Sequence, residues 1–327
     1  MVRRIDWESQ IGRRLKLRDL HVFYTAVQSG SMAKAAQQLG VSQPVVSEVI
    51  ADLENTLGVR LLDRHRHGVE PTKYGDALIK RGTVVFDELK QSVRDIGFLA
   101  DPAAGEVTFG WTETMEAILS PVMEKFTQQY PRVLLRSNQV TQLSGHPGLR
   151  GRSLDFTLGY FVKWFPHNRF IDDLNLEVLF DDRQVVVAGM SSPWAGRRRK
   201  IDLAELVDEP WILPEGPDSW NYRVVEEAFR TRGLRVPKIS VMTLSVHLRI
   251  SLLASGRFIT TFPSAIPRFH AARRSIKVLP VNLPDLRCPV VIATLKNRTL
   301  NPVVERFIAH IRDFTRPMRD ERTMTKA

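Results

Sequence analysis

Two short helical patterns, joined by a turn of two residues, constrain the N-terminal part of this chain more than any other feature. Apolar residues recur at helical spacing in both segments: Met32, Ala35, Ala36 and Leu39 in the first, and Val46, Val49, Ile50, Leu53 and Leu57 in the second. The turn between them, Gly40-Val41, leaves room only for two helices that meet at a steep angle. The spacing predicts a helix-turn-helix, although a small helical hairpin with a solvated polar face would show the same pattern.

The second helical segment carries polar residues suited to a DNA groove. Ser42 is placed to cap this helix, and Pro44 is compatible with a first turn, where N–H groups lack intrahelical partners. Gln43, Ser47 and Glu48 are predicted on the face turned away from the core. Glutamine bonds an adenine edge through two hydrogen bonds, and serine suits several bases or a phosphate, so this face is chemically fit for the major groove.

The flanking segments fit the same module. An amphipathic helix precedes it and ends at Ser29-Gly30, because glycine readily stops a helix. Two short strands are predicted at 60–63 and 69–71, around a basic tip at 64–68. Such a tip is either an ordinary solvated loop or a wing that lies along phosphates, and its position directly after a helix-turn-helix favours the wing.

From Leu17 to about Ala100 the chain closely resembles the LysR-type transcriptional regulators. The matching residues are Leu20, Phe23, Val27, Gly30-Ser31, Ala35-Ala36, Leu39, Val41-Ser42-Gln43-Pro44, Ser47, Leu53-Glu54, Leu57-Gly58-Val59-Arg60-Leu61-Leu62, Arg64, Pro71-Thr72 and Gly75. The resemblance implies a winged helix-turn-helix that binds double-stranded DNA. It implies base contacts by Gln43, Pro44 and Ser47, phosphate contacts by Ser31 and Ser42, and backbone or minor-groove contacts by Arg64 and the wing.

Two positions depart from the family pattern. Position 48, commonly Arg or Lys in the family, is Glu48, which repels phosphate but accepts a hydrogen bond from the N4 amino group of cytosine. Position 67, often Arg in the family, is His67, and Arg66 beside it is a substitute cation. These departures leave DNA binding expected and bear on the preferred base sequence.

A long helix is predicted from Thr72, as its cap, towards Ala100. Its apolar stripe comprises Leu78, Val85, Leu89, Val93 and Ile96. Such a stripe between two domains is expected to bury against a second copy of itself, as in a coiled coil, or else to fold back onto its own chain. Family resemblance favours the first alternative and implies a homodimer or homotetramer.

The composition of the chain limits the classes of protein to which it can belong. The chain has 327 residues, of which 43% are hydrophobic and 25% charged, and its formal net charge of +11 suggests a polyanionic partner. A single cysteine, Cys288, excludes an internal disulfide framework, and we expect a structural role for it rather than redox sensing. No apolar run approaches the ~18 residues of a membrane span and no signal peptide is recognisable, so we expect a cytoplasmic protein without a membrane partner.

Beyond Asp101 the pattern changes to strands that alternate with helices, which predicts open α/β sheets. This half resembles the LysR effector domain, which has the fold of type II periplasmic binding proteins. The matching residues are Leu119, Pro121, Phe126, Tyr130-Pro131, Val133, Leu154-Asp155, Leu203, Leu206, Glu209-Pro210-Trp211, Ala254-Ser255-Gly256 and Phe262-Pro263. The resemblance implies two lobes with a small molecule bound between them.

The predicted fold class is therefore α/β, with an N-terminal winged helix-turn-helix, a long linker helix and a two-lobed effector-binding domain. The predicted boundaries are an N-terminal tail at 1–16, the DNA-binding domain at 17–74, the linker and dimerisation helix at 75–100, a hinge at 101–105, effector lobe I at 106–180 and 286–315, effector lobe II at 181–285, and a C-terminal tail at 316–327.

Candidate effector-binding residues follow from the predicted sheets. Ligands of open α/β sheets bind beyond the carboxyl ends of strands, where helix N-termini offer free N–H groups to anions. The residues at those places are Thr112, Glu113, Thr114, Thr141 and Tyr160 in lobe I, with Thr243, Leu244 and Ser245 in lobe II, the last three in a segment that contacts ligand in the family. Hydroxyl groups suit an anionic or polar metabolite, whereas Glu113 opposes an anion unless it points away, and each Thr or Ser is alternatively a simple helix cap.

No motif for phosphate binding, dinucleotide binding, a nucleophile elbow or a metal site occurs, so we expect neither an enzyme nor a cofactor. The function predicted is a sequence-specific transcriptional regulator controlled by a small-molecule effector, with RNA polymerase as a further partner if it activates. The alternatives are a constitutive repressor with a vestigial pocket, and a solute-binding protein or enzyme with an incidental helical module.

Overall fold

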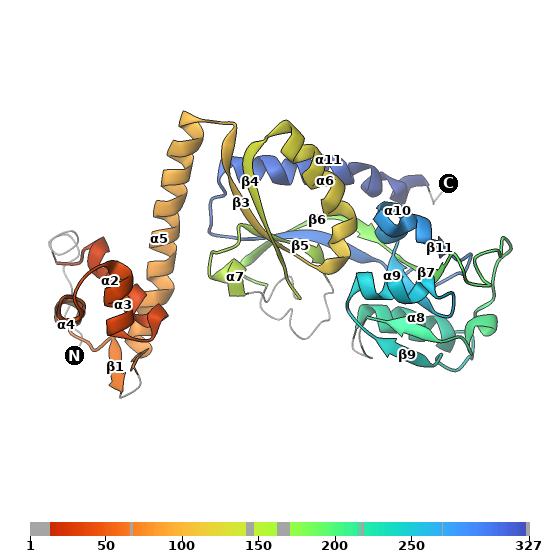
Figure 1. Cartoon of the computed structure of the whole chain (residues 1–327), viewed down its shortest axis with the longest axis horizontal. Coiled ribbons are helices and arrows are strands. Elements are labelled where there is room, and N and C mark those ends of the chain that lie inside the picture. The colour runs from red at the N-terminus through yellow and green to blue at the C-terminus, as the bar shows by residue number, and fades with distance from the viewer. Residues whose placement is uncertain are drawn as a thin grey trace. The chain divides into compact units, whose positions relative to one another are not determined.

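The computed structural model describes residues 14–65, 68–141, 147–161, 171–214, 216, 219–269 and 271–324. The chain divides into two compact units, Met1–Lys90 and Gln91–Ala327 (Figure 1). Each unit has its own hydrophobic core and is described by itself.

The first unit is a helical domain with a two-stranded antiparallel hairpin. Its elements are α2 (Leu17–Ser29), α3 (Met32–Leu39), α4 (Gln43–Leu57), β1 (Leu62–His65), β2 (Gly68–Pro71) and the first part of α5 (Lys73–Ala100). The apolar faces read from the sequence meet in its core, where Ala35, Val46 and Ile50 are fully buried against Phe23 of α2. The helix-turn-helix and its covering helix are thus present as predicted.

The hairpin is joined to the helices by specific backbone contacts. Gly30 ends α2 in the left-handed conformation, and its carbonyl oxygen accepts from the Val69 N–H at 3.0 Å. Gly68 has φ +143°, and a Cβ there would lie 2.1 Å from the Gly30 oxygen, so only glycine allows this approach. The strand predicted at 60–63 lies two residues further along the chain, since β1 spans Leu62–His65.

Lobe I of the second unit is built on a five-stranded sheet in the order β4-β3-β5-β12-β6. Its strands are β3 (Ala104–Trp111), β4 (Arg132–Gln139), β5 (Phe156–Tyr160), β6 (Leu174–Asp182) and β12 (Cys288–Leu295), and its helices are α6 (Glu116–Gln129), α7 (Pro147–Arg150) and α11 (Pro302–Met324), with a 3₁₀ turn η1 (Glu113–Met115). Strands β4, β3 and β5 are parallel, so their carboxyl ends lie at one edge of the sheet. Phe109, Phe126, Phe156 and Phe307 form the aromatic centre of its core.

Lobe II carries a second five-stranded sheet, in the order β11-β7-β10-β8-β9. Its strands are β7 (Gln184–Gly189), β8 (Trp211–Leu213), β9 (Ile239–Met242), β10 (Ile259–Pro263) and β11 (Ile276–Val278), and its helices are α8 (Trp220–Arg230), α9 (Val246–Ala254) and α10 (Ala265–Phe269), with 3₁₀ turns η3 (Leu203–Leu206) and η4 (Ala271–Ser275). The chain passes between the sheets from Asp182 to Gln184 and returns between Val278 and Cys288. The mixed helix and sheet class expected from the sequence is therefore observed.

Some boundaries differ from the sequence-based expectation. Some strands carry a weak sequence signal: β6 has an irregular apolar pattern, and β9 and β11 are only four and three residues long. The last helix, α11, continues to Met324 despite Pro317, so most of the C-terminal tail expected at 316–327 is helical. None of the described helices combines the length and hydropathy needed to cross a bilayer.

Candidate DNA-reading surface and effector cavity

The N-terminus of α4 is open on its solvent side. Ser42 occupies the N-cap position in an extended conformation, but its hydroxyl caps no N–H group, which corrects the expectation of a side-chain cap. Ser31 stands in the same way before α3, also without a capping bond. Ser42 and Gln43 are exposed, so the first-turn N–H groups and both side chains are available to a polyanion.

The predicted base-reading residues are not equally accessible. Gln43, Pro44 and Glu48 are exposed, as expected for a face turned away from the core. Ser47 is half-buried, and its hydroxyl donates to the Met32 sulfur at 3.2 Å, so it is turned partly inward. At Ser47, α4 thus offers less polar surface to a DNA groove than the sequence pattern suggested.

Glu54 connects helix α4 to the hairpin. Its Oε1 accepts from the N–H groups of Leu61 and Leu62, at 2.7 Å and 3.1 Å. Arg64 is exposed on β1, next to the tip, while Arg66 and His67 lie outside the described residues. The Glu54 carboxylate thereby fixes the start of the strand that carries Arg64.

The linker helix begins as predicted, with Thr72 accepting from the Gly75 N–H at 3.2 Å. Leu78 packs against the core of the first unit and so does not belong to the exposed stripe, which corrects its assignment. Further along α5, Val93, Ile96 and Leu99 are 70%, 67% and 79% exposed. An apolar stripe so exposed in the single chain is the kind of surface that a second helix covers.

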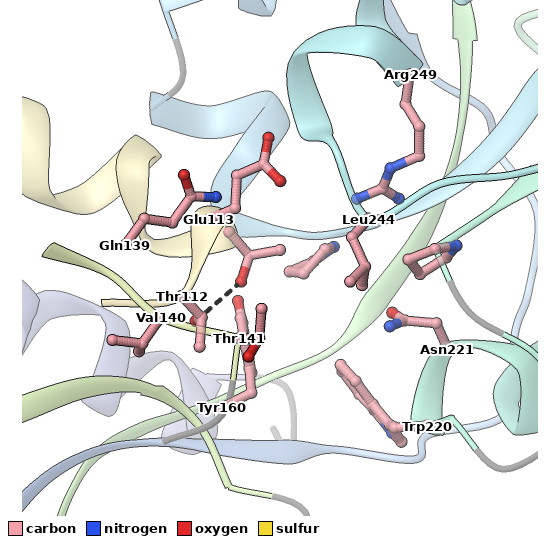
Figure 2. Close-up of a pocket in the computed structure, with 13 residues that line it drawn as sticks. Thr112, Glu113, Gln139, Val140, Thr141, Tyr160, Trp220, Asn221, Leu244 and Arg249 are labelled. Carbon is pink, nitrogen blue, oxygen red and sulfur yellow. Dashed lines mark hydrogen bonds between the residues drawn. The ribbon is translucent and has the colours of Figure 1, made fainter. Parts of the chain in front are cut away.

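The second candidate site is a cavity of about 220 Å³ in the second unit, lined from both lobes (Figure 2). The lining residues that the structure describes are Thr112, Glu113, Thr114, Gln139, Val140, Thr141, Tyr160, Pro214, Trp220, Asn221, Leu244, Arg249 and Pro263. Six of the eight candidate effector residues are thus brought together. Those of lobe I come from the ends of β3, β4 and β5 because these parallel strands end at the same edge of the sheet.

Thr243 and Ser245 do not line the cavity, and local hydrogen bonds explain why. The Ser245 hydroxyl accepts from the Leu248 N–H at 3.2 Å and so caps α9. The Thr243 hydroxyl accepts from the Ser245 N–H at 3.2 Å. For Ser245 the simple capping alternative therefore describes the structure, while Thr243 forms a local bond to that cap residue.

The negative charge of Glu113, in lobe I, is compensated by a hydrogen bond from lobe II. Its Oε1 accepts from the backbone N–H of Val246, the first residue of α9, at 2.7 Å. A carboxylate at a helix N-terminus is stabilised by the positive end of the helix dipole. Glu113 therefore already bonds one of the N-terminal N–H groups of a helix that we expected an anionic ligand to bind.

Tyr160 contributes its ring to the cavity while its hydroxyl is already bonded. The phenol donates to Asp182 Oδ2 at 2.7 Å, and the ring stacks on Trp220, with centroids 5.8 Å apart. Burial, followed by the Asp182 carboxylate, raises the pKa of Tyr160 well above its ordinary value, so the phenol stays neutral. Asp182 also accepts from the N–H groups of Ser264 and Ala265, which fixes it where the chain crosses between lobes.

Arg249 is the functional candidate that the sequence analysis missed. It is 1% exposed, its guanidinium donates to the Thr261 carbonyl at 3.1 Å, and it lies 4.3 Å from the centroid of the Phe262 ring. Among the described residues its Nε has no hydrogen-bond acceptor, and no carboxylate forms an ion pair with it. Burial lowers its pKa to about 10, with Glu113 partly opposing the shift, so Arg249 remains charged at neutral pH.

The sequence did carry a signal for Arg249. Val246, Ile250 and Leu253 form the buried face of α9, and Arg249 falls within that stripe rather than opposite it. A cation on the core face of a helix requires a compensating partner, since burying an isolated charge is costly. No cluster of three or more His, Cys, Asp or Glu residues in the described part of the chain is arranged to hold a metal ion.

Two family models match the chain. Residues 17–76 match the bacterial regulatory helix-turn-helix protein, lysR family, and residues 100–316 match the LysR substrate binding domain. Among curated proteins, the HTH-type transcriptional regulator TdcA of Escherichia coli (strain K12) is 30% identical over 249 residues, covering 76% of this chain and 77% of TdcA. The HTH-type transcriptional regulator GbpR of Azospirillum brasilense is 26% identical over 301 residues, covering 91% of this chain and 86% of GbpR.

Solved structures show the same fold. Full-length CbnR complexed with its target DNA superposes with a TM-score of 0.59 at 21% identity, covering 92% of this chain and 100% of the CbnR chain. A full-length OxyR variant from Pseudomonas aeruginosa superposes with a TM-score of 0.59 at 23% identity, covering 92% of this chain and 95% of the OxyR chain.

Proposed function

Because the chain belongs to the LysR family of DNA-binding transcriptional regulators, we propose that α4 and the wing read its operator and that the cavity between the lobes binds its effector. In this assignment Gln43, Pro44, Ser47 and Glu48 face base edges, Ser31 and Ser42 contact phosphates, and Arg64 with the wing follows the DNA backbone. The exposed and uncapped N-terminus of α4 supports it. The domain boundaries predicted from the sequence are part of the same proposal, except that most of the C-terminal tail belongs to α11.

The effector in this proposal is a small metabolite that carries an anionic group, and Arg249 is the observation on which it rests. A guanidinium that is 1% exposed, lines a cavity and lacks an ion-pair partner among the described residues is a ready counter-ion for a carboxylate. A vestigial pocket would gain nothing from an uncompensated buried charge. The cavity of about 220 Å³ is below the ~300–1,000 Å³ of sites for drug-sized ligands, which favours a small metabolite.

The assembly we propose is a homodimer or homotetramer formed through the exposed stripe of α5. It works in the cytoplasm, where its DNA is, as a regulator and not as an enzyme. RNA polymerase is a further partner if bound regulator activates transcription.

Operator binding is tested by selecting bound fragments from the host genome in vitro and sequencing them. An enriched interrupted palindrome is expected, because a symmetric assembly reads two half-sites. Recovery of no preferred sequence at physiological salt would contradict operator reading by the free protein.

Effector control is tested on that operator with a deproteinised small-molecule extract of the host cells. The extract is expected to change operator affinity or DNA bending with the wild-type chain. Thr112→Val, which removes a hydroxyl from the cavity at nearly constant volume, and Arg249→Gln are expected to abolish that response while DNA binding is retained. If both variants respond like the wild type, the cavity is not the effector site.

A further inference from the structure

The cavity contains two opposite charges that do not form an ion pair. Glu113 comes from η1 of lobe I and Arg249 from α9 of lobe II, and they are the only formally charged side chains among the described lining residues. Figure 2 shows Arg249 extending from α9 and Glu113 arising from the segment that also carries Thr112. Each group therefore retains capacity for a further partner.

The capacity of Glu113 follows from its hydrogen bond to α9. One oxygen accepts the Val246 N–H at 2.7 Å. An ionised carboxylate accepts about four hydrogen bonds, so acceptor sites remain on both oxygens. On Arg249, the Nε–H has no acceptor among the described residues, and the Thr261 carbonyl accepts from Nη1. A neutral carbonyl and the Phe262 ring face compensate a buried cation less well than a carboxylate does.

Charge balance discriminates among ligand classes. With Glu113 and Arg249 both ionised, the described lining is formally neutral. A ligand with only a negative charge compensates Arg249 and leaves the charge of Glu113 without a ligand partner. A ligand with only a positive charge compensates Glu113 and leaves Arg249 without one. A ligand with one charge of each sign compensates both groups and adds no net charge to a buried site.

The remaining lining fits a small body attached to such a charge pair. Hydroxyl groups of Thr112, Thr114 and Thr141 offer hydrogen bonds, while Val140 and Leu244 supply apolar surface. The stacked rings of Tyr160 and Trp220 present π-electron faces, which attract an ammonium group.

We propose that the effector is a small zwitterion of the α-amino-acid type, whose carboxylate binds Arg249 and whose ammonium group binds Glu113. This inference rests on the proposed function of the cavity as the effector site. In the free protein, Glu113 already bonds the N-terminus of α9, so the ligand binds to a pair of lobes that a carboxylate holds together beforehand.

The test uses the full-length protein and three matched sets of probes at constant ionic strength. The first set is the twenty proteinogenic L-amino acids, the second their desamino acids, which lack the ammonium group, and the third their amides, which lack the carboxylate. Binding is measured by isothermal titration and by the shift of the thermal unfolding midpoint. At least one amino acid is expected to bind, and its desamino acid and amide are each expected to bind at least tenfold more weakly.

Three variants assign the charges. Glu113→Gln keeps the size of the side chain, and we expect it to weaken the amino acid at least tenfold while the desamino acid binds as before or more tightly. Arg249→Gln is expected to abolish binding, and Arg249→Lys, which keeps the charge, to restore part of it if the glutamine variant folds poorly. Glu116→Gln is the matched control, because Glu116 is an exposed carboxylate three residues away that does not line the cavity, and it should bind like the wild type.

The outcomes separate this inference from the function on which it rests. If desamino acids bind the wild type as tightly as amino acids, or if no amino acid binds, the zwitterion proposal is wrong. In either case, if the operator complex still responds to cell extract in a way that depends on Thr112 and Arg249, the cavity remains the proposed effector site. If that response depends on neither residue, the proposed function of the cavity is wrong as well.

Discussion

The helices proposed to read DNA and the cavity proposed to bind an effector obtain their side chains in different ways. The proposed reading residues, between Ser31 and Glu48, follow one another along two adjacent helices. The cavity draws its lining from two sheets, with residues as far apart in the chain as Thr112 and Pro263. The first kind of site is determined by local periodicity and turn geometry, whereas the second depends on which strand ends the tertiary structure brings together.

The two sites also differ in whether their polar side chains have hydrogen-bond partners within the protein. Ser31 and Ser42 precede helices without capping them, and solvent is available to both. In the cavity and beside it, Glu113, Tyr160 and Ser245 are all bonded to protein groups, and Arg249 stands out because it lacks an ionic partner among the described residues. An exposed reading surface thus tolerates unused polar groups that a buried site does not.

The largest effect is expected from Gly68→Ala, which tests whether the hairpin of the first unit depends on its close backbone contact with Gly30. The new Cβ would lie 2.1 Å from the Gly30 carbonyl oxygen at a φ of +143°, so the wing must shift. We expect a loss of about 3 kcal/mol in the stability of the first unit, from overpacking and backbone strain. Chemical denaturation followed by circular dichroism measures it. Gly82→Ala, in α5 of the same unit, where a Cβ meets nothing within 4 Å, is the control and should not lower the stability.

Gln43→Ala tests direct reading by an exposed side chain. It is expected to cost about 1–3 kcal/mol on the selected operator and little on random DNA, because a bidentate base contact carries sequence information. Fluorescence anisotropy with both DNAs measures the difference. Arg64→Ala is the matched comparison, since loss of a phosphate contact should weaken both and reduce the salt slope by about 1. Equal losses on both DNAs for Gln43→Ala would contradict its reading role.

Ser245→Ala separates a cap from a ligand contact in the effector unit. Removing the hydroxyl that accepts from Leu248 is expected to lower stability by about 1 kcal/mol, as for other N-cap losses. The effector response should remain, in contrast to Thr112→Val. Thermal unfolding and operator titration with extract measure the two quantities, and a lost response at unchanged stability would make Ser245 a binding residue.

The smallest effect is expected from alkylation of Cys288. Burial raises the pKa of this thiol to about 12, with a further contribution from Asp182, so at pH 8 only on the order of one molecule in ten thousand carries the reactive thiolate. Iodoacetamide should leave the native protein unlabelled over an hour and label it fully after denaturation. Rapid labelling of the native protein, followed by mass spectrometry, would show that the thiol is accessible and would reopen a redox role.

Much of the reading module was predictable because its determinants are local. The apolar spacing located α3 and α4, and Thr72 was correctly identified as the cap of α5. The sequence could not show that Ser47 bonds Met32, or that Glu54 holds the start of β1, because both contacts depend on the angle between elements. Leu78 was assigned to the exposed stripe because helical spacing alone does not tell which residues another domain element covers.

The cavity was predictable only in part. The carboxyl ends of β3, β4 and β5 were located from the strand pattern, and Thr112, Thr141 and Tyr160 do line the cavity. Asn221, Trp220 and Arg249 were missed because helices α8 and α9 reach the site through the packing of lobe II, which no local pattern encodes. The sequence also could not show that the Tyr160 hydroxyl is bonded to Asp182, 22 residues further along the chain.

The sequence by itself determined the winged helix-turn-helix, the long helix, the alternation of strands and helices, and the family, because periodicity, turn residues and motif spacing are properties of neighbouring residues. Only the tertiary structure decided that Glu113 caps α9 from the other lobe and that Arg249 is buried in the cavity without an ionic partner among the described residues. Burial and charge pairing arise between segments distant in the chain, and the proposed zwitterionic ligand is inferred from them.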